Sequence, residues 1–214
     1  MTSAPAPIRT TRAEMFFDPT CPWAWMTSRW LMEAAQVRDL DVTWSVMSLA
    51  VLNDGRDLDE GYRSFLTKAW GPVRVIVAAT KDLPADDANT LRKKMYDALG
   101  QRIHLDGRGT DDIDAVIAEV VEELGLDAAL TDVAGSDVVD DELRASHQRA
   151  IDLVGDDVGT PVVSVEGTAF FGPVVTPAPK GEAAGRLWDG CLLVAATPGF
   201  YEIKRSRQVG PDFS

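Results

Sequence analysis

Cys21 is the residue whose type and position best suit it for chemistry. It begins the tetrapeptide Cys21-Pro22-Trp23-Ala24, after an apolar stretch typical of a buried strand and before a helical pattern. Because proline is favoured in the first turn of a helix, Pro22 predicts a helix that begins directly after the cysteine. Free backbone N–H groups and the helix dipole stabilise a thiolate at such a position. We therefore expect Cys21 to have a lowered pKa and to act as a nucleophile.

The alternative for any single cysteine is a buried and inert thiol. The only other cysteine, Cys191, lies far away in the sequence within a predicted helix, where it is typical of a core residue. Because the strand, cysteine, proline and helix context applies to Cys21 alone, we expect Cys21 to be alkylated more readily than Cys191.

A second segment that bears on chemistry is Gly159-Thr160-Pro161, which leads into a predicted strand. Proline is tolerated at a strand start because it has no N–H group to donate to the sheet. Since about 5–6% of the bonds before proline are cis in folded proteins, general statistics favour a trans bond between Thr160 and Pro161.

The two histidines differ in context. His104, which follows Arg102 and Ile103, could point into a crevice, bind substrate and support a thiolate. The alternative is a structural role, which is more common for a lone histidine. His147 lies in a charged helical pattern and is expected at the surface. No cysteines and histidines have the spacing of metal ligands, so the sequence predicts no metal.

Two sets of elements must position these residues. Strand patterns at residues 13–18 and 42–47, with a helical pattern between them, predict a βαβ unit with parallel strands. Further along the chain, residues 161–165 and 168–171 are separated by two turn-forming residues and predict a β-hairpin. Because neither half could bury its faces alone, we expect all four strands in one sheet.

Between these halves the strand patterns give way to helical ones. We expect this block to be an insertion above the carboxyl ends of the parallel strands, where α/β folds place their ligand crevices. Ser136 is the expected N-cap of its last helix, and a final helix closes the fold. Helices are predicted over residues 60–69, 72–81, 85–102, 111–124, 136–154 and 179–195.

The predicted fold class is α/β, with one sheet and an all-helical insertion. Residues 1–12 are typical of a flexible leader. The expected domains are residues 13–58 together with 155–214, and a helical insertion subdomain at residues 59–154.

Length and composition are those of a globular protein. Of 214 residues, 45% are hydrophobic and 26% are charged. The net charge of −13 would repel phosphate backbones and anionic lipids, so neither nucleic acid nor a membrane is an expected partner. The sequence has no run of about 18 apolar residues and no secretory signal in its leader, so we expect a cytoplasmic protein.

These features together resemble a known family. The cysteine at a helix start, the helical insertion and the Thr160-Pro161 strand start are similar to the DsbA-like branch of thioredoxin-fold proteins. More closely, four stretches resemble the mycothiol-dependent oxidoreductases and nitroreductases of actinobacteria. These stretches, spread over both halves of the chain, are residues 17–23, 46–53, 69–74 and 170–174.

The resemblance implies a thioredoxin-like fold and a thiol-disulfide oxidoreductase or reductase. Its co-substrate would be a low-molecular-weight thiol, mycothiol by resemblance, and its substrates would be nitroaromatic compounds or disulfides. The resemblance also implies a cis Thr160-Pro161 bond in contact with Cys21. Residues implied to line the crevice are Trp23, Thr160, Pro161, Asn53 and Tyr62.

Structural roles remain open for two of these residues. Asn53 also suits a turn, and Tyr62 also suits ordinary helix packing. The oligomeric state, a homodimer included, is not fixed by the sequence.

The chain departs from the family at one position. The family motif is Cys-Pro-Trp-Cys, and Ala24 stands where the second cysteine would be. In a dithiol enzyme the second thiol resolves the mixed disulfide, which alanine cannot do. We therefore expect Cys21 to be a single nucleophile whose intermediate is resolved by an external thiol, whether the loss of the second cysteine is natural or engineered.

Two other functions remain open. A kappa-type glutathione transferase or chromene-carboxylate isomerase shares this architecture and uses one serine or cysteine to activate a thiol without net redox change. The missing second cysteine favours that alternative. The other is a ligand-binding module with a vestigial Cys21, which a thiol pKa near the ordinary value of about 8.5 would support.

Overall fold

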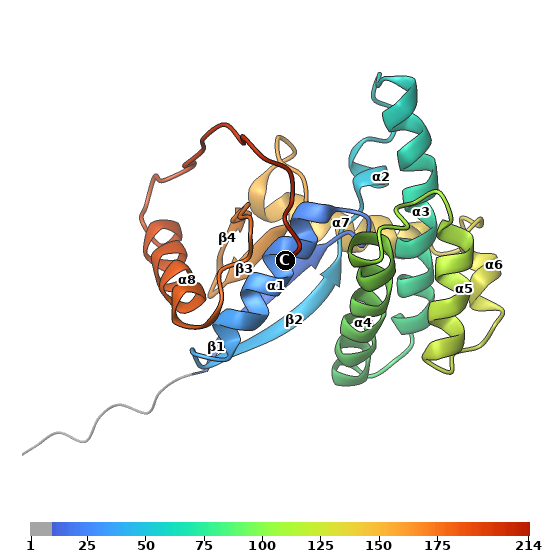
Figure 1. The fold of residues 1–214 in the computed structure, drawn as a ribbon, viewed down its shortest axis with the longest axis horizontal. Coiled ribbons are helices and arrows are strands. Elements are labelled where there is room, and N and C mark those ends of the chain that lie inside the picture. The colour runs from blue at the N-terminus through green and yellow to red at the C-terminus, as the bar shows by residue number, and fades with distance from the viewer. Residues whose placement is uncertain (1–9) are drawn as a thin grey trace, which may run out of the picture.

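A four-stranded sheet lies at the centre of the computed structural model, which describes residues 10–214 (Figure 1). β1 (Thr11–Phe17) pairs in parallel with β2 (Leu40–Val46) and antiparallel with β3 (Val162–Val165). β4 (Thr168–Phe171) pairs antiparallel with β3, so the strand order is β2-β1-β3-β4. The predicted βαβ unit, the hairpin and their union in one sheet are confirmed.

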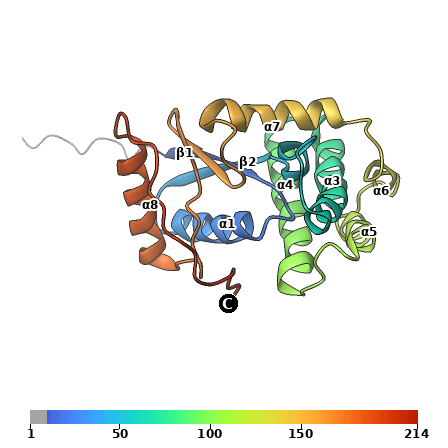
Figure 2. The same ribbon diagram turned by 90° about the horizontal axis from the view of Figure 1, so that it is seen from above.

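Helices cover both faces of this sheet (Figure 2). α1 (Pro22–Ala35) and α8 (Gly181–Ala195) pack together on one face, and α7 (Asp140–Val154) crosses the other. Two buried tryptophans join α1 to α8: the ring centroids of Trp30 and Trp188 lie 6.0 Å apart. Burial of these large apolar rings fixes α1, and therefore its first turn, against the sheet.

The chain between β2 and β3 is helical. Figure 1 shows this block beside the end at which β2 finishes, as expected for an insertion at the carboxyl ends of the parallel strands. One apolar cluster runs through the sheet and the block, so the domain boundaries at residues 59 and 154 stay predictions. Before α7, the block contains α2 (Leu49–Leu52), α3 (Glu60–Thr80), α4 (Ala85–Gly100), a π-helical turn (Gln101–Leu105), α5 (Ile113–Glu123) and α6 (Leu130–Val133).

The predicted break at Pro72 is wrong, because α3 runs through the proline as one helix. Proline removes one backbone donor and disfavours a helix interior. Here, however, the same helix buries apolar side chains on both sides of the proline. They are Leu66 and Ala69 before it, and Val73 and Ile76 after it. Tertiary packing of this continuous apolar face outweighs the local penalty.

The other predicted helix ends shift by a few residues. The helix predicted to Arg102 changes to a π-helical turn after Gly100. Ser136 is not the N-cap of α7, which begins at Asp140 after Val139. At the other end of the chain, β1 already begins at Thr11, so the last two residues of the predicted leader belong to the sheet.

Residues 1–9 of that leader lie outside the described residues. No helix among residues 10–214 combines the length and the hydrophobicity of a transmembrane segment.

Candidate active site

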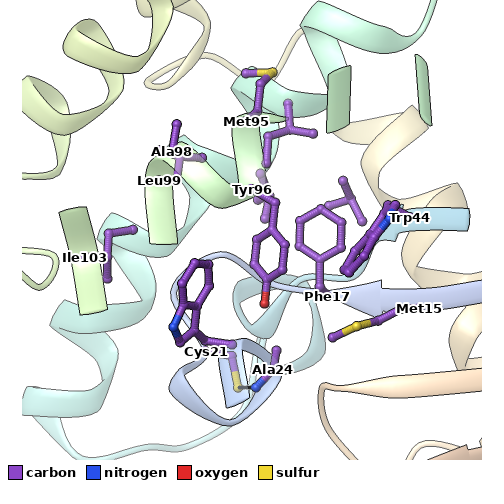
Figure 3. Packing of buried hydrophobic residues seen from close by; sticks show 14 of the residues in the cluster. Met15, Phe17, Cys21, Ala24, Trp44, Met95, Tyr96, Ala98, Leu99 and Ile103 are labelled. Carbon is purple, nitrogen blue, oxygen red and sulfur yellow. Dashed lines mark hydrogen bonds between the residues drawn. The ribbon is translucent and has the colours of Figure 1, made fainter. Parts of the chain in front are cut away.

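Cys21 is the N-cap residue of α1, as the sequence predicts. Its backbone is extended (φ −83°, ψ 111°), and Pro22 follows as the first helical residue. The backbone N–H of Ala24 donates to the Cys21 Sγ at 3.4 Å (Figure 3). The sulfur therefore takes the place of the oxygen that usually caps a helix.

The segment before β3 faces the same sulfur. The Thr160–Pro161 bond is cis, and the Cys21 thiol donates to the Thr160 carbonyl oxygen at 3.5 Å. The Thr160 hydroxyl donates in turn to the Phe16 carbonyl oxygen at 3.5 Å. The cis bond and the contact with Cys21 are thus confirmed, and the trans bond that general statistics favour is wrong here.

The lowered pKa expected for Cys21 is wrong for this enclosed site. Only 5% of the residue is exposed, and burial raises the pKa of its thiol to about 12 because the thiolate loses its hydration. The backbone N–H groups of Ala24 and Trp23 lower the pKa, as a helix N-terminus should, but burial outweighs them. The Asp18 carboxylate raises it further, and the Arg207 guanidinium lowers it.

Thiol acidity therefore does not single out Cys21 from Cys191. Burial also raises the pKa of Cys191, to about 11, and this residue packs against the apolar cluster from α8. What distinguishes Cys21 is its surroundings, since the backbone N–H groups of α1 favour its thiolate, whereas burial is the cause that shifts the pKa of Cys191.

Asp18 is a site residue that the sequence reasoning missed. Its fully buried carboxylate accepts from the Thr20 backbone N–H at 2.8 Å, the Thr20 hydroxyl at 2.7 Å and the Leu49 N–H at 2.7 Å. Burial raises its pKa to about 6, although these hydrogen bonds lower it. The carboxylate ties the loop that carries Cys21 to the start of α2. A charged residue at the end of an apolar strand, directly before Pro19, is the signal that could have identified it.

His104 lies beside this loop, not at the sulfur. Its Nε2 is 2.9 Å from the Pro19 carbonyl oxygen. Because a carbonyl only accepts, this nitrogen carries the hydrogen. Burial lowers the pKa of His104 to about 4, so the ring is neutral at pH 7. The Phe213 ring stacks on the His104 ring with centroids 5.6 Å apart, and the Trp25 ring lies tilted to it at 5.7 Å.

Tyr62 and Asn53 lie on the side of the site formed by α3 and α2. Burial raises the pKa of Tyr62, and the charges of Cys21 and Asp18 raise it further. A hydrogen bond from the Asn53 side chain lowers it. The Asn53 amide also donates to the Leu49 carbonyl oxygen at 2.8 Å and closes α2. The substrate-binding roles expected for Asn53 and Tyr62 stay predictions.

Tyr96 is a second residue that the sequence reasoning missed. Its ring is fully buried, 4.0 Å from that of Phe17 between centroids, and its hydroxyl points toward the turn of Cys21 and Ala24 (Figure 3). The Ser28 hydroxyl lies near enough to lower the Tyr96 pKa, yet its hydrogen goes to the Trp25 carbonyl oxygen at 2.6 Å. Within residues 10–214 the Tyr96 hydroxyl has no hydrogen-bond partner.

Removing this unpaired hydroxyl should not destabilise the protein. We expect Tyr96→Phe to leave the free energy of unfolding unchanged or to raise it by about 1 kcal/mol, because a buried polar group without a partner costs roughly 1–3 kcal/mol. Urea denaturation measures the change, and Tyr201→Phe, at a residue 94% exposed, is the matched control. A loss of more than about 1 kcal/mol would mean that the hydroxyl is paired.

Stability should rise with pH between about 4 and 6.5. His147, predicted at the surface, is only 5% exposed, and its Nδ1 accepts from the Ser48 N–H at 3.3 Å. Burial lowers the pKa of His104 and of His147 to about 4. The unfolded chain therefore binds more protons over this range, and folding gains stability as pH rises.

Asp18 acts in the opposite sense, because its pKa of about 6 is above the ordinary value. The effect of the two histidines exceeds that of the carboxylate, so the free energy of unfolding should show a net rise on the order of 3 kcal/mol. We expect His147→Asn, which keeps an acceptor for Ser48, to make the free energy of unfolding nearly independent of pH over this range. Urea denaturation at several pH values measures this dependence. If the free energy of unfolding rises with pH as steeply in the variant as in the parent, His147 is not a cause of the rise.

The described residues hold no group of three or more His, Cys, Asp or Glu side chains arranged to bind a metal ion. The site that they do form is a cysteine at a helix N-terminus, opposite a backbone carbonyl and beside a buried carboxylate. Such an arrangement can form and break bonds to sulfur.

Comparison with known proteins adds a family and a fold. A family model described as Rv2466c-like, mycothiol-dependent nitroreductase Rv2466c, matches residues 20–205. The uncharacterized protein Rv2286c of Mycobacterium tuberculosis (strain ATCC 25618 / H37Rv) is 29% identical over 199 residues, covering 92% of this chain and 83% of that protein.

Two solved structures show the same fold. The cytosolic disulfide reductase DsbM from Pseudomonas aeruginosa with GSH is 19% identical, has a TM-score of 0.52, and covers 85% of this chain and 99% of that one. A putative protein disulfide isomerase from Nitrosomonas europaea is 15% identical, with a TM-score of 0.53 and coverage of 86% and 98%. The thioredoxin-like, DsbA-like fold with a helical insertion is therefore confirmed.

Proposed function

We propose that this chain, which belongs to the Rv2466c-like family of mycothiol-dependent nitroreductases, uses Cys21 as its single nucleophile in disulfide exchange with a low-molecular-weight thiol. Family and fold make it a thiol-disulfide oxidoreductase. The observation that carries the finer proposal is the surroundings of Cys21: it caps α1, faces the Thr160 carbonyl oxygen, and has Ala24 where a resolving thiol would stand.

The first step is attack by Cys21. The thiol loses its proton to solvent once the crevice opens, and the N–H groups of Ala24 and Trp23 hold the thiolate. The thiolate attacks one sulfur of a disulfide. A bond forms between the Cys21 Sγ and that sulfur, the original S–S bond breaks, and the other half leaves as a thiolate.

The second step needs a thiol from outside the chain. Ala24 has no sulfur, so an external thiolate attacks the half of the mixed disulfide that is bound to Cys21. A new disulfide forms between the two small molecules, and the Cys21 thiolate is released. Electrons pass from the external thiol to the substrate, and no other oxidant or reductant takes part.

Mycothiol is the thiol that the family description favours, and GSH, another low-molecular-weight thiol, is bound in the DsbM structure. We infer that Trp23, Asn53, Tyr62 and His104 form the walls against which the thiol and a disulfide or nitroaromatic substrate bind. Trp23 is next to the helix start, and the other three lie on the side of the helical block.

Turnover of a small disulfide with reduced mycothiol tests the proposal. Cys21→Ser should abolish the reaction, because the hydroxyl is not a nucleophile at neutral pH, whereas Cys191→Ser should retain it. A Cys21→Ser variant that keeps the activity would show that another group carries the chemistry.

Ala24 also favours a second candidate, activation of a thiol without net redox change, as in the kappa-type transferases and chromene-carboxylate isomerases. Such an enzyme would bind the reduced thiol and form no mixed disulfide. Binding of reduced mycothiol by calorimetry, together with a protein mass that oxidised mycothiol does not change, would support this candidate over disulfide exchange.

A further inference from the structure

The chain after α8 returns to the Cys21 site. Figure 1 shows this segment, in dark red, arching away from α8 and ending in front of α1, and Figure 2 shows the C-terminus on the same side as α1. We call residues 200–214 the strap. It contains no helix or strand.

Three contacts hold the strap down. The Arg207 guanidinium lies 4.9 Å from the centre of the Trp23 ring. The Phe213 ring stacks on that of His104, with centroids 5.6 Å apart and an angle of 30° between the planes. The Asp212 N–H donates to the Thr176 hydroxyl at 2.7 Å.

The first two contacts involve residues next to the segment that carries Cys21. Trp23 belongs to the first turn of α1, directly after Cys21 and Pro22. His104 is hydrogen bonded to the Pro19 carbonyl oxygen in the loop before Cys21. The strap therefore contacts both the helical turn that follows Cys21 and the histidine that is bonded to the loop before it. Arg207 is also close enough to lower the Cys21 pKa.

The side chains of the strap are largely exposed to solvent. Tyr201 is 94% exposed and Val209 66%, and even Phe213 is 36% exposed. A segment with so little apolar burial and no backbone ladder opens at a small free-energy cost. Arg207 and Phe213 also lie beyond residue 205, where the match to the family model ends.

We propose that the strap closes the mouth of the Cys21 site and that it must leave before a small thiol or disulfide can reach the sulfur. That the strap excludes thiol and disulfide substrates rests on the proposed function. That it limits the access of an alkylating reagent to Cys21 does not. The Trp23 and His104 surfaces that the strap occupies are among those inferred to bind substrate, so strap and substrate would compete.

Release of the strap has two opposing effects on Cys21. Lower burial favours the thiolate, whereas loss of the Arg207 charge disfavours it. Burial is the largest of the causes that shift the Cys21 pKa, and the Arg207 charge is the smallest. The other groups that act on Cys21, Asp18 and the α1 backbone, are not part of the strap. The net result of release should be a more reactive thiol.

Alkylation of Cys21 in the full-length chain tests this. Arg207→Ala/Phe213→Ala removes the two ring contacts. Arg205→Ala/Val209→Ala is the control, because it removes the same charge and an exposed apolar side chain from the strap. Peptide mapping after brief iodoacetamide treatment gives the labelling of Cys21 relative to Cys191. We expect this ratio to rise roughly tenfold in the first variant, as for one pKa unit of thiolate fraction, and not in the control.

Equal Cys21 to Cys191 labelling ratios in the two variants, or a lower ratio in Arg207→Ala/Phe213→Ala, would contradict the proposal that the strap closes the site. The result is independent of the proposed function. Faster labelling of Cys21 in a protein that forms no mixed disulfide would support closure by the strap and contradict disulfide exchange. A mixed disulfide together with unchanged labelling ratios would support disulfide exchange and contradict closure by the strap.

Discussion

Ala24→Cys should convert a protein that stops at a mixed disulfide into one that closes an internal disulfide. In the parent chain no neighbouring thiol can attack the bond between Cys21 and the small thiol, so the adduct should accumulate. Residue 24 lies one helical turn after Cys21, and its backbone nitrogen is 3.4 Å from the sulfur. A thiol there is placed to displace the small thiol, which should leave as the two cysteines bond.

Intact mass after treatment with oxidised mycothiol separates these outcomes. The parent should gain the mass of one thiol, and Ala24→Cys should instead lose two hydrogens relative to its reduced form. Ala24→Ser, which adds one heavy atom but no thiol, is the matched control and should behave as the parent does. If the parent forms no adduct and Ala24→Cys forms no internal bond, the redox assignment is wrong.

Gly100→Ala should be among the most destabilising small substitutions in the chain. A Cβ at this position would lie 2.1 Å from Trp25 Cζ3 and 2.3 Å from Cε3, well inside van der Waals contact. Trp25 follows Ala24 in α1 and is only 3% exposed, so its ring has little room to move. Gly100 therefore sets how closely α4 approaches the helix that carries Cys21. We expect a loss of about 3 kcal/mol in the free energy of unfolding.

Urea denaturation measures this loss, and Gly190→Ala in α8 is its control. A Cβ at Gly190 meets nothing within 4 Å, so that substitution should stabilise the protein by up to about 1 kcal/mol through helix propensity. Near-native stability of Gly100→Ala would mean that α4 and α1 separate easily. In that case the fluorescence of the displaced Trp25 should change.

The parts of the fold that were predictable depend on local signals. A strand, a cysteine and Pro22 in succession indicate the start of α1, and two turn residues between two strand patterns indicate the β3 and β4 hairpin. The path of α3 through Pro72 was not predictable in this way. It depends on apolar contacts with distant parts of the chain, which no local pattern contains.

The same distinction applies to the site. The contact of Cys21 with Thr160 came from resemblance to a family, because the two residues are 139 positions apart. Helix position alone predicted a lowered Cys21 pKa, but burial by remote segments decides it in the enclosed site. Asp18 was missed because a single acidic residue has no periodicity, and its importance lies in the donors that the fold brings to it.

In the proposed mechanism, Cys21 alone exchanges disulfides with a small thiol. Incubation of the parent chain with oxidised mycothiol, followed by peptide mapping without reductant, identifies the cysteine that forms the adduct. We predict one thiol per chain, bound to the peptide that contains Cys21 and released by excess reduced mycothiol. An unmodified Cys21 peptide, or an adduct on Cys191 with Cys21 free, would show that Cys21 is not the nucleophile.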